Sequence, residues 1–240
     1  MLGDWVWGKS SRTGIFVALV AMAALWAGAA APPLANQDRR NESEWAKRDS
    51  WQRPADVMDA LGIGPGSVVA DIGAGRGYFT MRLAERVGSQ GRVLAVDIDE
   101  GNLARLRDRA EREGIKQIQT VQSSTTDPKL PPESVNAILV VNAYHEMRDF
   151  DAMMQGMWKG LKPCGVLGII DGEAPEGRSR EDYHSRHDIP ESLVRADAER
   201  AGFRFAGKKP GFRNGENETW YFLVFEKPSD KCERPAAGAR

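Results

Sequence analysis

The sequence predicts an α/β protein with a doubly wound, mostly parallel sheet of seven strands that ends in an antiparallel hairpin. From Pro54 onward, apolar runs rich in β-branched residues alternate with stretches whose apolar residues recur at helical spacing. This is the pattern of parallel strands joined by crossover helices. Near the end of the chain, two apolar runs follow each other without a helix between them. Such neighbours must pair antiparallel, because a parallel pair needs a crossover.

The seven strands are predicted where short apolar runs lie, at residues 67–72, 92–98, 118–122, 135–141, 166–170, 203–208 and 219–226. Helices are predicted from apolar stripes at about 54–61, 79–87, 103–110, 150–161 and 191–201. Gly88 and Gly114 stand where a helix C-terminus favours glycine. Residues 162–165 are predicted to form a turn. The mixed-charge stretch 176–188 is expected to be a solvated lid, with Tyr183 as the side chain that turns inward.

The composition is that of an ordinary globular protein and excludes a strongly basic binding surface. The 240 residues are 41% hydrophobic, and the formal net charge is −1. No polybasic field would draw the chain to nucleic acid, so a nucleic-acid partner is not expected. The two cysteines, Cys164 and Cys232, form neither a disulfide framework nor a metal-ligand spacing. They leave open a single bridge between them.

Four segments are predicted along the chain. Residues 1–35 are interpreted as a signal peptide or an N-terminal membrane anchor, because Lys9 and Arg12 precede the uncharged run 14–31. The richness of that run in Ala and Gly favours a cleaved signal over an anchor. Both interpretations place the body outside the cytoplasm, as an exported or periplasmic protein or one anchored to the membrane through residues 14–31. Residues 36–53 are predicted to be a polar linker and entry helix, 54–228 the main domain, and 229–240 a disordered tail.

A glycine-rich stretch after the first strand predicts the ligand. Gly73, Gly75 and Gly77 form a G-x-G-x-G pattern, preceded by Asp71. Bare glycines let a ligand lie against the backbone at the carboxyl end of a parallel strand. A dinucleotide fingerprint would need a glycine at position 78, which is Tyr, and a P-loop ending is absent. Asp97, which ends the second strand, can accept hydrogen bonds from ribose hydroxyls. Together, the two carboxylates and the absence of a phosphate-binding motif predict a ligand that has a ribose and a positive charge but no phosphate. S-adenosylmethionine has these properties.

The chain resembles the class I S-adenosylmethionine-dependent methyltransferases from about Trp51 to Pro228, through "VVADIGAGRGYF", "VLAVDID", "LPPESVNAILVVNAYHE", "LKPCGVLGII" and "YFLVFEKP". The resemblance implies their Rossmann-like fold. It also implies that Asp71, Gly73, Ala74, Gly75 and Gly77 line the methionine part of the cofactor, with Tyr78 covering the site from the start of the helix. By the same resemblance Asp97 holds the ribose, Ile98 packs on the adenine and Asn142 lies beside the cofactor. Ser124 stands beside the adenine, where relatives often have an acidic residue.

The catalytic candidates lie in loops that follow the fourth and fifth strands. "NAYHE" supplies Tyr144, His145 and Glu146, and His145 is interpreted evenly as a general base or a structural group. The spacing of His184 and His187 could bind a metal together with His145 or Asp171. Because polar loops produce such pairs by chance, no metal site is predicted.

The sequence therefore predicts a methyltransferase that transfers a methyl group to a small-molecule or exported acceptor by in-line displacement. One alternative is a catalytically inactive accessory protein that binds S-adenosylmethionine. A second is a nicotinamide-dependent oxidoreductase, which the G-x-G-x-G spacing and the closing hairpin disfavour. No oligomeric state is predicted.

Overall fold

The computed structural model describes residues 33–214, 218–230 and 232. The chain divides into two units, Met1–Ser43 and Glu44–Arg240, and each is described by itself. The predicted signal or anchor lies outside the described residues up to position 32, as do residues 233–240 of the predicted tail. Among the described residues, no helix combines the length and the apolar character needed to cross a bilayer.

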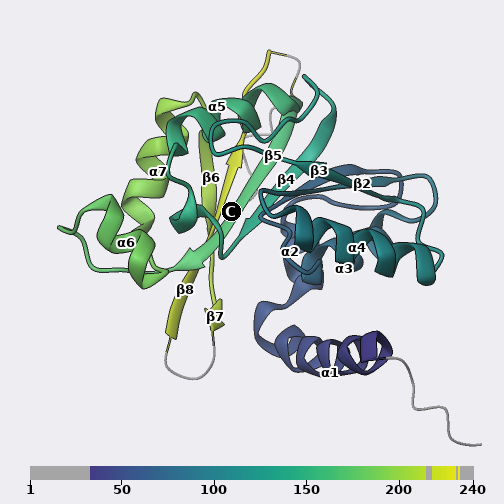
Figure 1. Ribbon diagram of the computed structural model, residues 1–240. Helices are drawn as coiled ribbons and strands as arrows, with labels where there is room; N and C mark the ends of the chain where they lie inside the picture. Colours follow the sequence, from purple (N-terminus) through teal and green to yellow (C-terminus); the bar gives the residue numbers. More distant parts are fainter. Residues whose placement is uncertain (1–32, 215–217, 231, 233–240) are drawn as a thin grey trace, which may run out of the picture. The chain divides into compact units, whose positions relative to one another are not determined.

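The second unit is built on the predicted sheet (Figure 1). Its main strands run in the order β3-β2-β1-β4-β5-β8-β6, and all neighbours from β3 to β5 are parallel. β8 pairs antiparallel with both β5 and β6, which confirms the closing hairpin. A short strand, β7, pairs with β8 away from this path. The strands are β1 (Val68–Ile72), β2 (Arg92–Asp97), β3 (Ile118–Gln122), β4 (Val135–Val141), β5 (Leu161–Gly172), β6 (Arg204–Lys209), β7 (Arg213–Asn214) and β8 (Glu218–Glu226).

Helices lie between the strands, as the apolar stripes predicted. They are α1 (Pro33–Gln52), α2 (Pro54–Ala60), α3 (Tyr78–Val87), α4 (Glu100–Arg112), η1 (Tyr144–Glu146, a 3-10 turn), α5 (Phe150–Gly160), α6 (Arg180–Arg186) and α7 (Glu191–Arg200). The helix α1 takes in the segment predicted as a linker and entry helix, and the division between the two units falls within it.

Both faces of the sheet are covered, and β4 shows how. Ile138 and Val140 belong to a buried cluster that includes side chains of α5 and α7. Ala137 and Leu139 belong to the cluster on the opposite face, with side chains of α2 and α3. The alternation follows the two-residue period of a strand. This double covering explains why the sequence of β4 is a nearly continuous apolar run.

Two segments differ from their predicted form. The predicted turn at residues 162–165 lies inside β5, because Leu161 already pairs with Val135 before the register shifts. Part of the predicted lid is a helix, α6, whose start is stabilised by a capping box between Ser179 and Asp182. Tyr183 is buried as predicted, and its hydroxyl donates to the Pro175 carbonyl at 3.0 Å.

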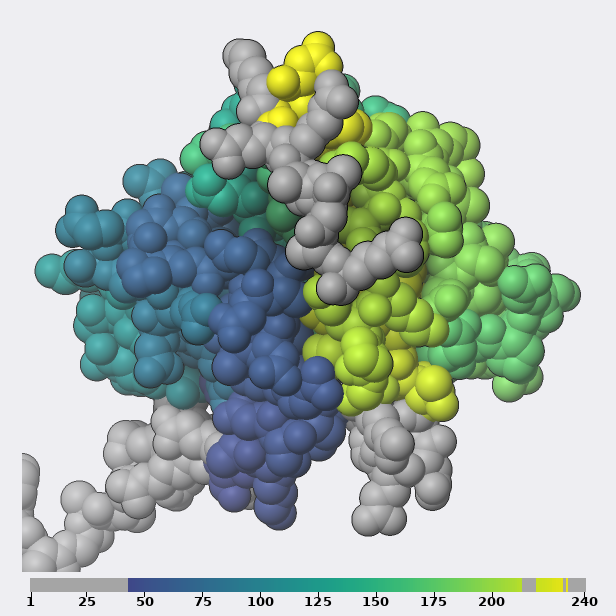
Figure 2. All heavy atoms as spheres, turned by 180° about the vertical axis from the view of Figure 1, so that it is seen from behind, coloured from purple at the N-terminus to yellow at the C-terminus, as the bar shows by residue number. Residues whose placement is uncertain are grey.

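The closing strands are held by contacts from distant parts of the second unit. Cys164 and Cys232 form a disulfide, with their Cα atoms 5.5 Å apart. The Trp51 ring of α1 packs edge-on against the Trp220 ring of β8, with 6.1 Å between the ring centroids. The Arg53 guanidinium donates to the Gly211 carbonyl at 3.4 Å. Figure 2 shows this arrangement from behind, with the blue start of the unit against the yellow-green closing strands.

Candidate active site

The predicted glycine loop lies between β1 and α3, and its three glycines differ in the space around their Cα atoms. All three have left-handed backbones, with φ of 75° at Gly73, 53° at Gly75 and 84° at Gly77. A Cβ on Gly73 would lie 2.4 Å from the Ala143 Cβ, and one on Gly77 would lie 2.4 Å from a Leu106 methyl. A Cβ on Gly75 would meet nothing within 4 Å. Gly75 is therefore the position where a ligand can approach the backbone.

Asp97 and Ile98 follow directly at the end of β2. The Asp97 Oδ2 accepts a hydrogen bond from the Gly75 amide at 2.7 Å, and its Oδ1 accepts from the Asp99 amide at 2.8 Å. These bonds orient the carboxylate toward the loop and leave each oxygen a second lone pair for a ribose hydroxyl. Among the described residues Ile98 is the exposed large hydrophobic side chain, 56% accessible, which suits packing against an adenine ring.

Asp71 is a buried acid beneath the glycine loop. Its Oδ2 accepts a hydrogen bond from the Thr80 hydroxyl at 2.6 Å. Burial raises the pKa of Asp71 to about 6, and the nearby Asp97 charge adds to the rise, while Thr80 opposes it. A bound cation would favour the ionised carboxylate and bring this pKa down again. Asp71 was predicted from the sequence, but Thr80 was not; its place on the first turn of α3 was the available signal.

The other predicted cofactor residues occupy varied settings. The Ala74 amide donates to the Val96 carbonyl at 3.0 Å. The buried Tyr78 ring lies near the guanidinium groups of Arg48 and Arg82, at 4.1 and 4.2 Å from the ring centroid, and its hydroxyl donates to Asp49 at 2.7 Å. The contacts that Arg48 and Asp49 make from α1 were not predicted.

Ser124 and Asn142 lie in the loops after β3 and β4. The Ser124 hydroxyl lies 3.3 Å from the Thr126 hydroxyl. The Asn142 amide donates to the Ile170 carbonyl at 2.8 Å, and its φ of 53° turns the chain at the end of β4. Asn142 is exposed, so its side chain is open to a ligand.

A polar cluster lies beyond the ends of β4 and β5, and His145 is its centre. The buried His145 ring places Nδ1 2.8 Å from the Asp171 Oδ1, and its backbone amide donates to the Asp171 Oδ2 at 3.1 Å. Asp171 is also fully buried and accepts from the Gly172 amide. A carboxylate with these donors holds the proton of His145 on Nδ1 and directs Nε2 away from β5.

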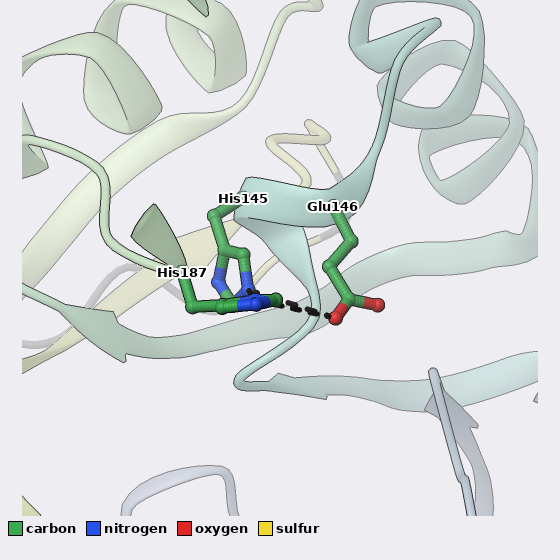
Figure 3. A group of neighbouring side chains, drawn as sticks. All are labelled: His145, Glu146 and His187. Atoms are coloured by element: carbon green, nitrogen blue, oxygen red, sulfur yellow. Dashed lines mark hydrogen bonds and ion pairs between the residues drawn. The ribbon is translucent and has the colours of Figure 1, made fainter. Parts of the chain in front are cut away.

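Two more side chains face His145 Nε2 (Figure 3). It lies 3.2 Å from the His187 Nδ1 and 3.8 Å from the Glu146 Oε1, and the last two atoms are 3.7 Å apart. Burial opposes protonation of His145, but its hydrogen bond to Asp171 and its attraction to the Glu146 carboxylate outweigh burial and raise its pKa to about 9. The interaction with His145 is also the main cause of the lowered pKa of Glu146.

Tyr144 and His184 do not join this cluster. The buried Tyr144 hydroxyl donates to the Asp197 Oδ2 at 2.7 Å, and burial raises the pKa of Tyr144 well above its usual value. His184 lines an adjacent pocket of about 100 Å³. The pocket is formed by η1, α6 and their flanking residues: Tyr144, His145, Met147, Arg148, Arg180, Glu181, His184 and Ile189.

Comparison with known proteins indicates a methyltransferase domain. A family model described as a methyltransferase domain matches residues 69–165. A ubiquinone/menaquinone biosynthesis C-methyltransferase from Hydrogenovibrio crunogenus is 26% identical over 189 residues, which are 76% of this chain and 72% of that protein. Other curated relatives with the same description are covered over only 50–58% of their length.

Solved structures share the fold. A SAM-dependent methyltransferase from Aquifex aeolicus superposes with a TM-score of 0.63 at 23% identity, over 77% of this chain and 97% of that chain. The cyclase SpnF superposes with a TM-score of 0.64 at 15% identity, over 73% and 80% of the two chains. The second case shows that this fold alone does not specify the reaction. The matched domain, the relatives and the shared fold together support a SAM-dependent methyltransferase, and the chain is similar to the class I members of that group.

Proposed function

We propose that the protein methylates a small-molecule acceptor bound at the polar cluster beside the glycine loop. The observation that carries this proposal is the close approach of Gly73 to Ala143. Ala143 immediately precedes η1, which carries His145 and Glu146. The cofactor loop and the polar cluster therefore adjoin at the carboxyl ends of β1 and β4, where open parallel sheets bind their ligands.

The cofactor side of the site is assigned to the loop and the residues after β2. S-adenosylmethionine, when bound, supplies a methyl group on a positively charged sulfur. Asp97 accepts hydrogen bonds from the ribose, Ile98 and Ser124 flank the adenine, and the backbone at Gly75 contacts the ligand. Asp71 supplies negative charge beneath the cation. Asn142 and Ala74 border the methionine part, and Tyr78 keeps α1 packed over the start of α3.

The acceptor side is assigned to His145 and Glu146. Asp171 fixes the His145 ring, so that Nε2 presents a constant position to the acceptor's nucleophilic atom. Holding nucleophile, methyl group and sulfur in line can supply roughly 7–11 kcal/mol of the barrier reduction in favourable cases. Tyr144 supports this arrangement from behind, because its bond to Asp197 ties η1 to α7.

A small organic acceptor fits the observations better than a macromolecule. The curated relatives are named for ubiquinone and menaquinone biosynthesis, which favours a small organic acceptor for this chain. The pocket of about 100 Å³ beside His145 has room for one functional group of an acceptor. The net charge of −1 gives no field for nucleic acid.

Calorimetry of the full chain with S-adenosylmethionine, S-adenosylhomocysteine and NAD tests the cofactor assignment. We expect binding of the first two and none of NAD. Absence of S-adenosylmethionine binding at millimolar concentration contradicts the proposal. Turnover with a panel of thiols, amines, phenols and quinols then separates an enzyme from an accessory protein. An accessory protein would bind the cofactor and methylate no acceptor.

We also propose that the domain works outside the cytoplasm, in an exported or membrane-anchored protein. The disulfide between Cys164 and Cys232 supports this location, because such bonds persist in oxidising compartments. Fractionation of cells that make the protein, with N-terminal sequencing of the mature chain, tests the proposal. A chain that begins at Met1 in the cytosolic fraction contradicts it.

A further inference from the structure

The cluster at His145 contains three potential ligand atoms that converge on one point (Figure 3). They are the His145 Nε2, the His187 Nδ1 and the Glu146 Oε1, and all lie within 4.8 Å of one another. They come from η1 and from the end of α6, which are 41 residues apart in sequence when counted from Glu146 to His187. Local spacing therefore does not produce the cluster, and the fold brings the two segments together.

The separations match those of a tetrahedral metal site. Zinc–nitrogen bonds of about 2.0–2.1 Å place neighbouring ligand atoms about 3.3–3.4 Å apart. The two imidazole nitrogens are already 3.2 Å apart. The Glu146 Oε1 lies 3.8 and 3.7 Å from them, and its side chain is 55% exposed, so a small rotation closes the remaining gap.

The surroundings of His145 are those of a metal ligand. A ligating histidine commonly donates its other ring N–H to a carboxylate, which fixes the ring and increases its basicity. Asp171 provides this carboxylate at 2.8 Å from Nδ1, and it is fully buried and also accepts from the Gly172 amide. His187 reaches the same point because its left-handed backbone, with φ of 58°, turns the chain at the end of α6.

We propose that His145, His187 and Glu146 bind a divalent transition-metal ion such as Zn²⁺ and leave one coordination position open. Two imidazoles and one carboxylate are a known ligand set for catalytic zinc, whereas magnesium prefers oxygen ligands. Both cysteines are in the disulfide, so no thiolate competes for the metal. The adjacent pocket shares His145 with this ligand set.

The metal would activate the acceptor, and this part rests on the proposed function. A thiol or hydroxyl of the acceptor would bind the open position as its anion, and its proton would pass to water. The anion would then form a bond to the methyl carbon while the carbon–sulfur bond of the cofactor breaks. The sulfur keeps the electron pair and leaves as a neutral thioether.

Zinc titration of the untagged, EDTA-dialysed full chain tests the site. We expect one Zn²⁺ to bind per chain, and Co²⁺ to give the intense visible absorption of a four-coordinate site. His187→Ala and Glu146→Gln should each weaken zinc binding at least tenfold, and Asp171→Asn should weaken it by roughly 10–100-fold. His184→Ala is the matched control on the same helix and should leave zinc affinity unchanged.

Three results would overturn the metal site. They are no stoichiometric zinc binding by the wild type, unchanged affinity in His187→Ala, and an equal loss of affinity in His184→Ala. Thermal melts and S-adenosylhomocysteine binding report whether each variant is folded. Because zinc is measured without turnover, the two proposals fail separately: a chain that binds zinc but no cofactor refutes only the proposed function.

Discussion

The two halves of the site are built in different ways. The glycine loop is a local structure, in which positive backbone angles at Gly73, Gly75 and Gly77 create the surface within five residues. The polar cluster is assembled from side chains after β4, at the end of β5 and after α6. A local structure leaves a pattern in the sequence, whereas a cluster from distant segments leaves only single residues. The cofactor half should therefore respond to backbone changes, and the acceptor half to changes in individual side chains.

The largest expected effect is on turnover in the acceptor half. His145→Asn removes the ring that Asp171 orients, and we expect kcat to fall at least 10²-fold, about 3 kcal/mol in barrier height. Cofactor affinity should stay near the wild-type value, because His145 does not line the glycine loop. Single-turnover kinetics with an identified acceptor, and calorimetry with S-adenosylhomocysteine, measure the two effects.

Tyr144→Phe is the matched comparison for that result. It removes the hydroxyl that donates to Asp197 and should lower thermal stability while most of the turnover remains. A loss of kcat as large as that of His145→Asn would mean that Tyr144 acts on the acceptor directly.

Changes in the glycine loop should act on stability and cofactor binding together. Gly73→Ala combines a left-handed backbone with a clash against the Ala143 Cβ, and we expect a loss of roughly 2–5 kcal/mol in the free energy of unfolding. Gly75→Ala has the backbone cost without the clash and should lose only about 1 kcal/mol. Urea denaturation compares the pair, and equal losses would contradict the packing of Gly73 on Ala143.

Substitution of the buried acid Asp71 should raise the stability of the chain and weaken its binding of the cofactor. Its pKa of about 6 in the folded chain lies above the unfolded value of 3.8, so its stabilising contribution is complete below pH 4 and is lost as the pH rises through 6. Asp71→Asn should equal the wild type near pH 4 and exceed it by roughly 3 kcal/mol at pH 7 without cofactor. It should also bind S-adenosylmethionine more weakly. Denaturation curves at both pH values, with calorimetry at pH 7, check the crossover.

The smallest expected effect concerns the exposed side chain of Ile98. Ile98→Ser should weaken cofactor binding about fivefold to tenfold, because one apolar contact of roughly 1 kcal/mol is lost. Stability should hardly change, since the side chain is 56% exposed without ligand. A strong loss of stability with unchanged binding would remove Ile98 from the cofactor site.

The sequence predicted the sheet well because its signals are periodic. The bounds of β3 and β4 agree with the predicted runs, and the closing hairpin follows from the absence of a crossover. The turn at residues 162–165 was placed outside the strand because Pro and Gly interrupt the pattern, yet β5 continues through it. The pairs of Leu161 with Val135 and of Val166 with Ala137 and Glu226 hold the two ends of this segment in the sheet, and a single sequence does not show such pairing.

The site was predictable only where chemistry and spacing coincide. Asp97 was identified from its position after β2, but its bonds to two backbone amides show that it also shapes the loop. The choice of His187 over His184 as the neighbour of His145 depends on one left-handed residue at the end of α6. The bond between Tyr144 and Asp197 joins residues 53 positions apart, a contact that no local pattern shows.

The position of β8 has a consequence for the order of assembly. In the part of the chain that the structure describes, β6 pairs only with β8, although β6 is synthesised first. A nascent chain that ends before β8 would therefore expose the unpaired side of β5 and leave β6 without a partner. An open strand edge invites pairing with other chains. A newly made chain therefore remains prone to aggregation until β8 has been synthesised and paired. Chains truncated before residue 218 should form inclusion bodies.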